Sequence, residues 1–220
     1  MLQLKSLKKA YLQGSQKIEI FEDLNFHLEK GQRVAIMGKS GSGKSTLLSL
    51  ISGIIKPDLG DISLNSVFYK DLKESELNDF RATNIGFIFQ NFHLVSYLNA
   101  LENVMLPAKV CNISNPKEKA IELLKSVGLS HRLDHLPSQL SGGEKQRVAI
   151  ARALIHNPKI ILADEPSGNL DEETGIAVMD ILFELIKANN TTLILVTHSK
   201  DVAMRCEKTY ELILGKLTQC

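Results

Sequence analysis

Hydrophobic and polar positions along the chain follow two different periods, and these predict strands and helices in turn. Between residues 24 and 28 every second residue is apolar, which is typical of a strand with one buried face. Residues 172–188 instead carry apolar side chains at helical spacing. Uninterrupted apolar runs, which favour buried strands, lie at 34–37, 85–89, 160–163 and 193–196. Strands that alternate with helices predict an α/β fold around a parallel sheet.

The middle of the chain, from residue 91 to residue 138, has a different pattern and is expected to be helical. A helix that begins near Ala100 should end at Pro107, because proline cannot donate a backbone hydrogen bond. Asn115 is expected to cap a second helix whose first residue is Pro116. We therefore predict a helical subdomain inserted into the core.

Composition limits the size of the protein and its partners. The chain has 220 residues, 44% of them hydrophobic, which suffices for a single domain over 1–220. Lysine and arginine together number 26 and aspartate and glutamate 25, so the net charge is +1. This balance predicts no nucleic-acid partner. The early lysines are more typical of a solvated face; they are Lys5, Lys8, Lys9 and Lys17.

Cysteine usage and hydropathy bear on location. Cys111, Cys206 and Cys220 are scattered and odd in number, which favours reduced thiols in a cytosolic protein. The N-terminus lacks the apolar stretch of a secretory signal, and nothing approaches the ~20 residues of a membrane span. If the protein works at a membrane, we expect another chain to hold it there.

A glycine-rich segment follows the apolar run at 34–37. It fits G-x-x-x-x-G-K-[ST] between a predicted strand and a predicted helix, the context that this phosphate-binding motif requires. Its backbone N–H groups and the helix dipole favour phosphate, Lys44 can reach the β- and γ-phosphates, and the Ser45 hydroxyl can ligate Mg²⁺. An ordinary Gly/Ser-rich loop is the alternative. The residues expected to bind ATP are Gly38, Lys39, Ser40, Gly41, Ser42, Gly43, Lys44, Ser45 and Thr46.

Two acidic residues end the apolar run at 160–163. Ligands of open α/β sheets bind at the carboxyl ends of the strands, where Asp164 and Glu165 would emerge. Asp164 is expected to orient Mg²⁺, through water, and Glu165 to polarise the attacking water as a general base. Alone, such a run is more often structural; the phosphate loop upstream favours the functional interpretation.

Ser141, Gly142 and Gly143 precede a predicted helix that runs to about His156. The first N–H groups of a helix have no intrahelical partner, so this start is a second candidate anion site. The alternative is a plain capped helix. One chain would thus carry two phosphate-binding helix starts.

Together, the segment from Leu140 to Arg147 and the two motifs above resemble the nucleotide-binding subunit of an ABC transporter, over the whole chain. The resemblance implies a P-loop NTPase core with a mixed, mainly parallel sheet, an N-terminal antiparallel β part and an α-helical subdomain at 91–138. It also implies hydrolysis of MgATP by two copies arranged head to tail. Each ATP would lie between one subunit's phosphate loop and the other's Ser-Gly-Gly.

The resemblance assigns further roles. Tyr11 would stack on adenine, Asp171 would contact the second subunit, and His198 would contact the γ-phosphate. Gln90 would sense Mg²⁺ and water and link to the membrane partner. A polar loop start at Gln90 and a locally bonded strand-end histidine at His198 are the alternatives. The implied catalytic residues are Lys44, Gln90, Glu165 and His198. The implied Mg²⁺ ligands are Ser45, Gln90 and Asp164. The implied contacts to the ATP of the other subunit are Ser141, Gly142, Gly143 and Glu144.

Segments 100–104, 132–137 and 164–171 are similar to the branch that includes lipoprotein-releasing, macrolide-exporting and cell-division ATPases. Ser167 departs from the threonine usual there but keeps the hydroxyl. The branch implies export or release of a lipoprotein, lipid or drug-like substrate through a membrane permease that docks near Gln90 to Pro107. The chain would then be peripheral, on the cytoplasmic side of the inner membrane.

An alternative function is that of a non-transport switch, either a soluble ATPase or a membrane mechanotransmitter. A single phosphate loop and the absence of a heptad run disfavour the soluble switch. The mechanotransmitter stays open, because its ATPase chemistry would be identical. Motif and fold do not identify the cargo.

Overall fold

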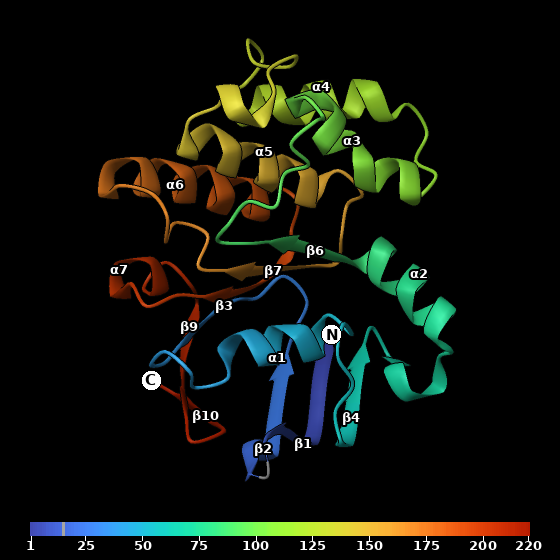
Figure 1. Cartoon of the computed structure of the whole chain (residues 1–220), viewed down its shortest axis with the longest axis vertical. Coiled ribbons are helices and arrows are strands. Elements are labelled where there is room, and N and C mark those ends of the chain that lie inside the picture. The colour runs from blue at the N-terminus through green and yellow to red at the C-terminus, as the bar shows by residue number, and fades with distance from the viewer. Residues whose placement is uncertain (15) are drawn as a thin grey trace. The chain divides into compact units, whose positions relative to one another are not determined.

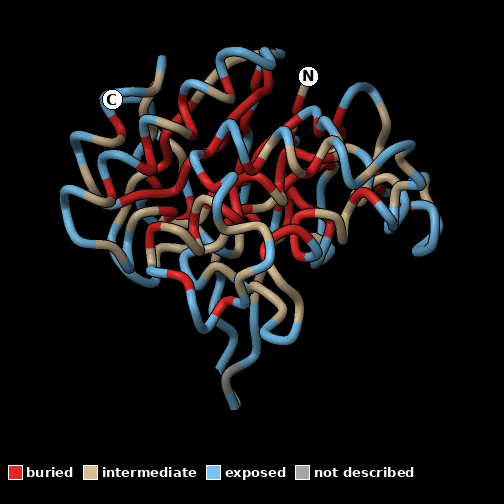
Figure 2. The backbone as a smooth tube through the Cα atoms, turned by 90° about the horizontal axis from the view of Figure 1, so that it is seen from above, coloured by how far each residue is buried: buried red, intermediate tan, exposed pale blue. Residues whose placement is uncertain are grey.

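The computed structural model describes residues 1–14 and 16–220 and contains two compact units. The first unit consists of residues 1–81 and 192–220, and the second of residues 82–191. Buried residues are drawn in red in Figure 2, and they occur on strands and helices of both units. No helix among the described residues is both long enough and apolar enough to cross a membrane.

The first unit contains an antiparallel sheet with the strand order β2-β1-β4-β5 (Figure 1). Its strands are β1 (Leu2–Gln13), β2 (Gln16–Leu28), β4 (Leu59–Leu64) and β5 (Val67–Phe68). The alternation predicted for 24–28 is present, since Leu24, Phe26 and Leu28 are buried and the residues between them are exposed. This sheet is the N-terminal antiparallel part expected from the resemblance.

The first unit also holds the parallel strands that support the phosphate loop. β3 (Arg33–Met37) pairs in parallel with β8 (Thr192–Val196) and β9 (Lys208–Ile213), and β10 (Lys216–Gln219) is antiparallel to β9. β8 is buried along its whole length, as expected for an apolar run in a parallel sheet. The helices of the first unit are α1 (Lys44–Ile51), η1 (Tyr69–Asp71) and α7 (Lys200–Ala203). A further helix, α2 (Glu74–Asn84), begins in the first unit and ends at the first residues of the second.

In the second unit, β6 (Ile85–Ile88) pairs in parallel with β7 (Ile160–Asp164). Its helices are α3 (Ala100–Val110), α4 (Pro116–Ser126), η2 (Pro137–Gln139), α5 (Gly142–Leu154) and α6 (Glu172–Ala188). α3 packs against α4 and α5, while α5 also contacts α6 and β6. α3 and α4 fall in the stretch predicted to be helical.

The helix expected to end at Pro107 continues to Val110, so that prediction was wrong. Proline removes one helical hydrogen bond, but the rest of α3 offsets this loss. A capping box closes its start, where Asn99 accepts from the Glu102 amide at 2.8 Å and Glu102 accepts from the Asn99 amide at 2.9 Å. Its inner face, including Val104, is fully buried. Packing therefore outweighs the local preference.

Asn115 precedes the first residue of α4, as predicted, but does not cap the helix through its side chain. Its φ of 52° places it in the left-handed region, which asparagine tolerates better than most residues. The predicted boundary was correct and the predicted capping bond was not.

Candidate functional site

The phosphate loop connects β3 to α1 in the first unit. Gly43, the residue before α1, has φ 99°. A Cβ there would lie 2.7 Å from Ile20 Cγ2 and 3.2 Å from the Phe21 ring. Only glycine therefore fits where the loop passes against β2 and turns into the helix.

Lys44 closes this loop from the first position of α1. Its ammonium donates to the carbonyls of Gly38 at 2.7 Å and Lys39 at 2.9 Å. The Ser42 amide also donates to the Lys39 carbonyl, at 3.2 Å. The Ser42 hydroxyl is buried without a hydrogen-bond partner within the described part of the chain. Because buried polar atoms are normally satisfied, this oxygen fits a loop that awaits a polar ligand.

His198 lies just beyond the end of β8, the strand that pairs with β3. Ile36 and Val196 are register partners, and the Thr197 amide donates to the Ile36 carbonyl at 3.2 Å. Parallel neighbours end at the same edge of a sheet, so the phosphate loop and His198 leave from one edge of the first unit. His198 is exposed there. The structure thus brings these two predicted parts of the site together.

Tyr11, on β1, is partly exposed, and the Lys9 ammonium lies 5.5 Å from its ring centroid. Asp58 fixes this stretch of β1, since it accepts from Lys9 Nζ at 2.8 Å and from the Ala10 amide at 2.7 Å. These bonds lower the pKa of the Asp58 carboxyl. The sequence pattern places Lys9 on a solvated face and does not predict its bond to Asp58, because no local signal marks a partner 49 residues away.

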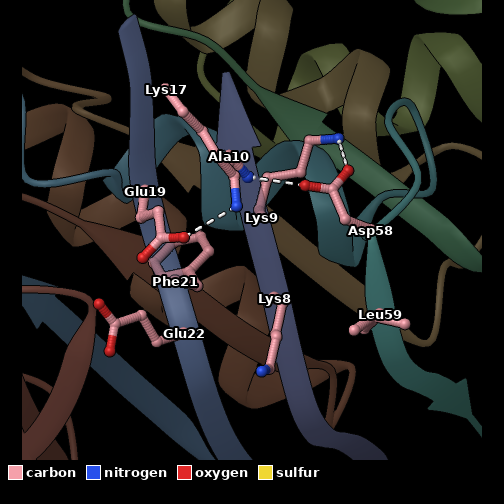
Figure 3. A pocket seen from close by; sticks show the side chains of 9 residues that line it. All are labelled: Lys8, Lys9, Ala10, Lys17, Glu19, Phe21, Glu22, Asp58 and Leu59. Carbon is pink, nitrogen blue, oxygen red and sulfur yellow. Dashed lines mark hydrogen bonds and ion pairs between the residues drawn. The ribbon is translucent and has the colours of Figure 1, made fainter. Parts of the chain in front are cut away.

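A pocket of about 320 Å³ is lined by residues of β1, β2 and the start of β4 (Figure 3). Lys8, Lys17 and Glu19 line it, and Lys17 pairs with Glu19 at 2.9 Å. Phe21 lines it too, and the same ring would touch a Cβ on Gly43. The pocket therefore adjoins the start of α1.

Asp58→Asn should loosen β1 before Tyr11, because it removes the charged partner of Lys9. We expect the KM for ATP to rise by about twofold, the scale of one partly exposed ion pair. A lowered pKa stabilises the fold at pH values above the ordinary value of 3.8, and this contribution is lost as the pH falls through the folded-state pKa. Denaturant unfolding should show a difference between the wild type and Asp58→Asn that is constant near neutrality and shrinks in acid. A difference that grows in acid would contradict this assignment.

In the second unit, two tight turns join the carboxyl end of β7 to α6. Glu165 has φ 48°, an uncommon conformation for a residue other than glycine and one that concentrates at functional sites. Its carbonyl accepts from the Gly168 amide at 2.9 Å, and the Ser167 carbonyl accepts from the Leu170 amide at 3.1 Å. Asp171 then caps α6 by accepting from the Thr174 amide at 2.9 Å, which lowers the pKa of Asp171.

Gln90, just after β6, contacts these turns. Its side-chain amide donates to Asn169 Oδ1 at 3.1 Å, and Asn169 donates back to the Gln90 carbonyl at 3.0 Å and to Asn91 Oδ1 at 2.8 Å. The structure thus ties Gln90 to the segment between Glu165 and Asp171. No local pattern in the sequence predicts that Asn169 holds Gln90 and Asn91 by hydrogen bonds.

Ser141 caps α5 through a capping box. Its hydroxyl accepts from the Glu144 amide at 3.2 Å, and Glu144 Oε2 accepts from the Ser141 amide at 2.8 Å. Glu144 Oε1 pairs with Arg132 at 2.9 Å, and these bonds lower the pKa of Glu144. The start of α5 is thus capped, and the Glu144 carboxylate is engaged by groups of its own chain. A capping box satisfies two N–H groups, and those of Gly142 and Gly143 also lie in the first turn.

The start of α5 packs closely on the start of α6. A Cβ on Gly143 would lie 2.4 Å from Thr174 Cγ2, and one on Gly142 would lie 3.1 Å from Leu170 Cδ2. The second unit therefore groups Gln90, the Glu165–Asp171 turns and the Ser-Gly-Gly start. The first unit groups the phosphate loop and His198 at one strand edge and carries Tyr11 on its antiparallel sheet.

Comparisons with known proteins show the family of the chain. Residues 21–168 match the ABC transporter family. The chain is 45% identical to the lipoprotein-releasing system ATP-binding protein LolD of Legionella pneumophila, over 99% of this chain and 96% of the relative. It is 42% identical to the uncharacterized ABC transporter ATP-binding protein YbbA of Escherichia coli, over 100% of this chain and 97% of the relative.

Solved structures are similar along the whole chain. The dimeric ATP-binding cassette MJ0796 bound to ADP and Pi superposes with a TM-score of 0.92 at 40% identity, covering 100% of this chain and 98% of that one. The α/β P-loop NTPase fold predicted from the sequence is thereby confirmed, as is the resemblance to the lipoprotein-releasing branch. The chain belongs to the ABC transporter family, and it is an ATP-binding and ATP-hydrolysing subunit of that family.

Proposed function

We propose that this chain, as a homodimer, powers the release of lipoproteins from a membrane through a permease partner. The observation that carries the proposal is the 45% identity to a lipoprotein-releasing ATP-binding protein over almost the full length of both chains. The dimeric cassettes of the same fold support a second copy of this chain as partner.

The first unit binds nucleotide. Backbone N–H groups of residues 38–46 surround the phosphates, Lys44 contacts the β- and γ-phosphates, and His198 contacts the γ-phosphate. Tyr11 stacks on adenine. When ATP binds, phosphate oxygens replace the two carbonyls that Lys44 contacts in the free chain. Because phosphate oxygens are charged and carbonyls are neutral, the new hydrogen bonds are stronger.

The second unit supplies the hydrolytic groups. Glu165 accepts a proton from the attacking water, and Gln90 positions that water. Ser141, Gly142 and Gly143 contact the γ-phosphate bound to the second copy, and Asp171 contacts that copy beside them. Mg²⁺ fits the donor set of Ser45, Gln90 and Asp164, because hydroxyl, amide and carboxylate oxygens are the ligands it prefers. When bound, the metal neutralises phosphate charge.

The permease docks near residues 90–107. Within this stretch Tyr97 is 79% exposed, and aromatic side chains are enriched at protein interfaces. Docking there holds the chain peripherally on the cytoplasmic side of the inner membrane.

A pull-down from solubilised membranes of the native host tests the proposal. Tagged Glu165→Gln protein with MgATP should recover a membrane protein with few spans and a large outer domain. A Lys44→Ala/Glu165→Gln bait is the control, since it lacks the ammonium that engages ATP. Purified complex in liposomes should then release a lipoprotein to a soluble acceptor on ATP addition. Recovery of only soluble factors or ribosomes would contradict the transport function, and a permease complex that hydrolyses ATP without releasing lipoprotein would indicate mechanotransmission.

Gly143→Ala should disturb the start of α5, because the added Cβ would overlap Thr174 Cγ2. We expect ATPase activity to fall about tenfold and unfolding free energy to fall by about 1–3 kcal/mol. Thr174→Ser removes Cγ2 and keeps the hydroxyl. The atoms nearest to the new Cβ would then be Arg147 Nη1 and Thr174 Cβ, both at 3.9 Å. The double variant should recover stability and activity, and a double variant no better than Gly143→Ala would contradict the steric explanation.

A further inference from the structure

The turn that follows Gln90 has an unfavourable backbone. Phe92 has φ 58° and His93 has φ 47°, so two successive non-glycine residues occupy the left-handed region. Side chains with a Cβ rarely adopt this conformation, and it persists only where surrounding groups hold it. Something outside the turn must therefore maintain its shape.

Arg152, on α5, supplies the holding contact. Its guanidinium donates from Nη2 to the Phe92 carbonyl at 2.7 Å and from Nη1 to the His93 carbonyl. One planar group thus engages two successive carbonyls, which suits the fixed fork of arginine and not the single ammonium of lysine. The His93 ring adds an edge contact to the Phe89 ring, with centroids 4.7 Å apart.

The half of α5 that carries Arg152 is fixed to β6. A Cβ on Gly86 would lie 2.3 Å from the Ala153 carbonyl oxygen, so strand and helix approach very closely. His156 Nε2 lies 3.2 Å from the Ile85 carbonyl oxygen one turn later. At 1.5 Å per residue, about 15 Å of helix separates Arg152 from the Ser-Gly-Gly start. The same rigid helix therefore holds the turn at one end and presents Ser141 to Gly143 at the other.

We propose that Arg152 is a positioning residue for Gln90: by holding the Phe92 and His93 carbonyls it fixes the turn that places Gln90 and couples that turn to α5. Asn169 holds Gln90 from the other side, through three hydrogen bonds to Gln90 and Asn91. The inference rests on the role of Gln90 under the proposed function. The further step is that Gln90 responds, through Arg152, to the γ-phosphate of the ATP held by the second copy when that phosphate contacts the start of α5.

Arg152→Lys tests this coupling because it keeps the charge and loses the fork. We expect kcat to fall about tenfold while the KM for ATP changes less than about twofold, since the variant affects water positioning and not the phosphate loop. In a Gln90→Ala background the same substitution should lower kcat by less than about twofold. A purely structural role of Arg152 would lower kcat by equal factors in both backgrounds.

His156→Ala is the matched control, because it removes a contact between β6 and the residues that directly follow α5 and leaves the turn alone. It should lower Tm, and any effect on kcat should be the same with and without Gln90. His93→Gly covers the case in which Arg152→Lys folds poorly, since glycine adopts the left-handed region at little cost. Arg152→Lys/His93→Gly should then fold and exceed Arg152→Lys in kcat.

Three results would overturn the inference. They are an unchanged kcat in Arg152→Lys, equal losses of kcat in the wild-type and Gln90→Ala backgrounds, and an Arg152→Lys/His93→Gly double variant that fails to fold. If Gln90→Ala alone leaves kcat unchanged, the role of Gln90 under the proposed function fails instead. A loss in Gln90→Ala that is independent of Arg152 refutes only the coupling.

Discussion

Replacing Glu165 with glutamine should lower the kcat for ATP hydrolysis by about 10³-fold, the scale of a lost general base. Glutamine keeps the size of the side chain and its hydrogen-bonding capacity but cannot accept the proton of the attacking water. The left-handed backbone at Glu165 and the turn bond from its carbonyl to Gly168 do not depend on the carboxylate. The substitution should therefore spare the fold and the binding of ATP.

The same variant should accumulate as an ATP-bound dimer, because the closed state can no longer decay by hydrolysis. Size-exclusion chromatography with light scattering, with and without MgATP, measures this directly. Glu184→Gln is a matched control, since it makes the same charge change at an exposed position of α6. It should hydrolyse ATP at the wild-type rate and should not accumulate as an ATP-bound dimer. Hydrolysis by Glu165→Gln at the wild-type rate would show that another group is the base.

The elements that carry the site were predictable because their patterns are local. The run at 160–163 lies in β7, which extends one residue further to Asp164, and the helix predicted at 172–188 is α6 with the expected bounds. The glycine motif determined the loop before α1 in the same way. α3 was mispredicted beyond Pro107, because its stability comes from a capping box and from burial of Val104, which depends on packing partners.

The contacts that hold the site side chains were not predictable from the sequence. Gln90 and Asn169 are 79 residues apart, and Arg152 and Phe92 are 60 apart. No periodicity links such pairs, and each member alone is an ordinary polar or aromatic residue. Glu144 illustrates the same limit, because its capping box can be recognised locally whereas its pairing with Arg132 cannot. Motifs therefore predicted the groups that we propose to contact the nucleotide, while the contacts that position those groups became visible only in the fold.

Lys44→Ala should weaken ATP binding by at least about 100-fold, which corresponds to about 3 kcal/mol for charge-assisted bonds lost in a partly buried site. Alanine removes the proposed contact with the β- and γ-phosphates. It also removes the bonds from Lys44 to the Gly38 and Lys39 carbonyls, which can affect the stability of the loop before ATP binds. Titration of a fluorescent ATP analogue, with thermal unfolding in parallel, separates weak binding from loss of the fold.

Lys56→Ala is the matched control for the charge, because Lys56 is 70% exposed and pairs with Glu74 at the surface. Its affinity for ATP should equal that of the wild type. Lys44→Arg gives a finer test, since it keeps the positive charge but replaces a compact ammonium with a wider planar group. If binding requires a compact ammonium, Lys44→Arg should bind ATP nearly as weakly as Lys44→Ala. If binding requires only the positive charge, Lys44→Arg should bind ATP as the wild type does. Unchanged affinity in Lys44→Ala would refute the assignment of residues 38–46 as the phosphate-binding loop.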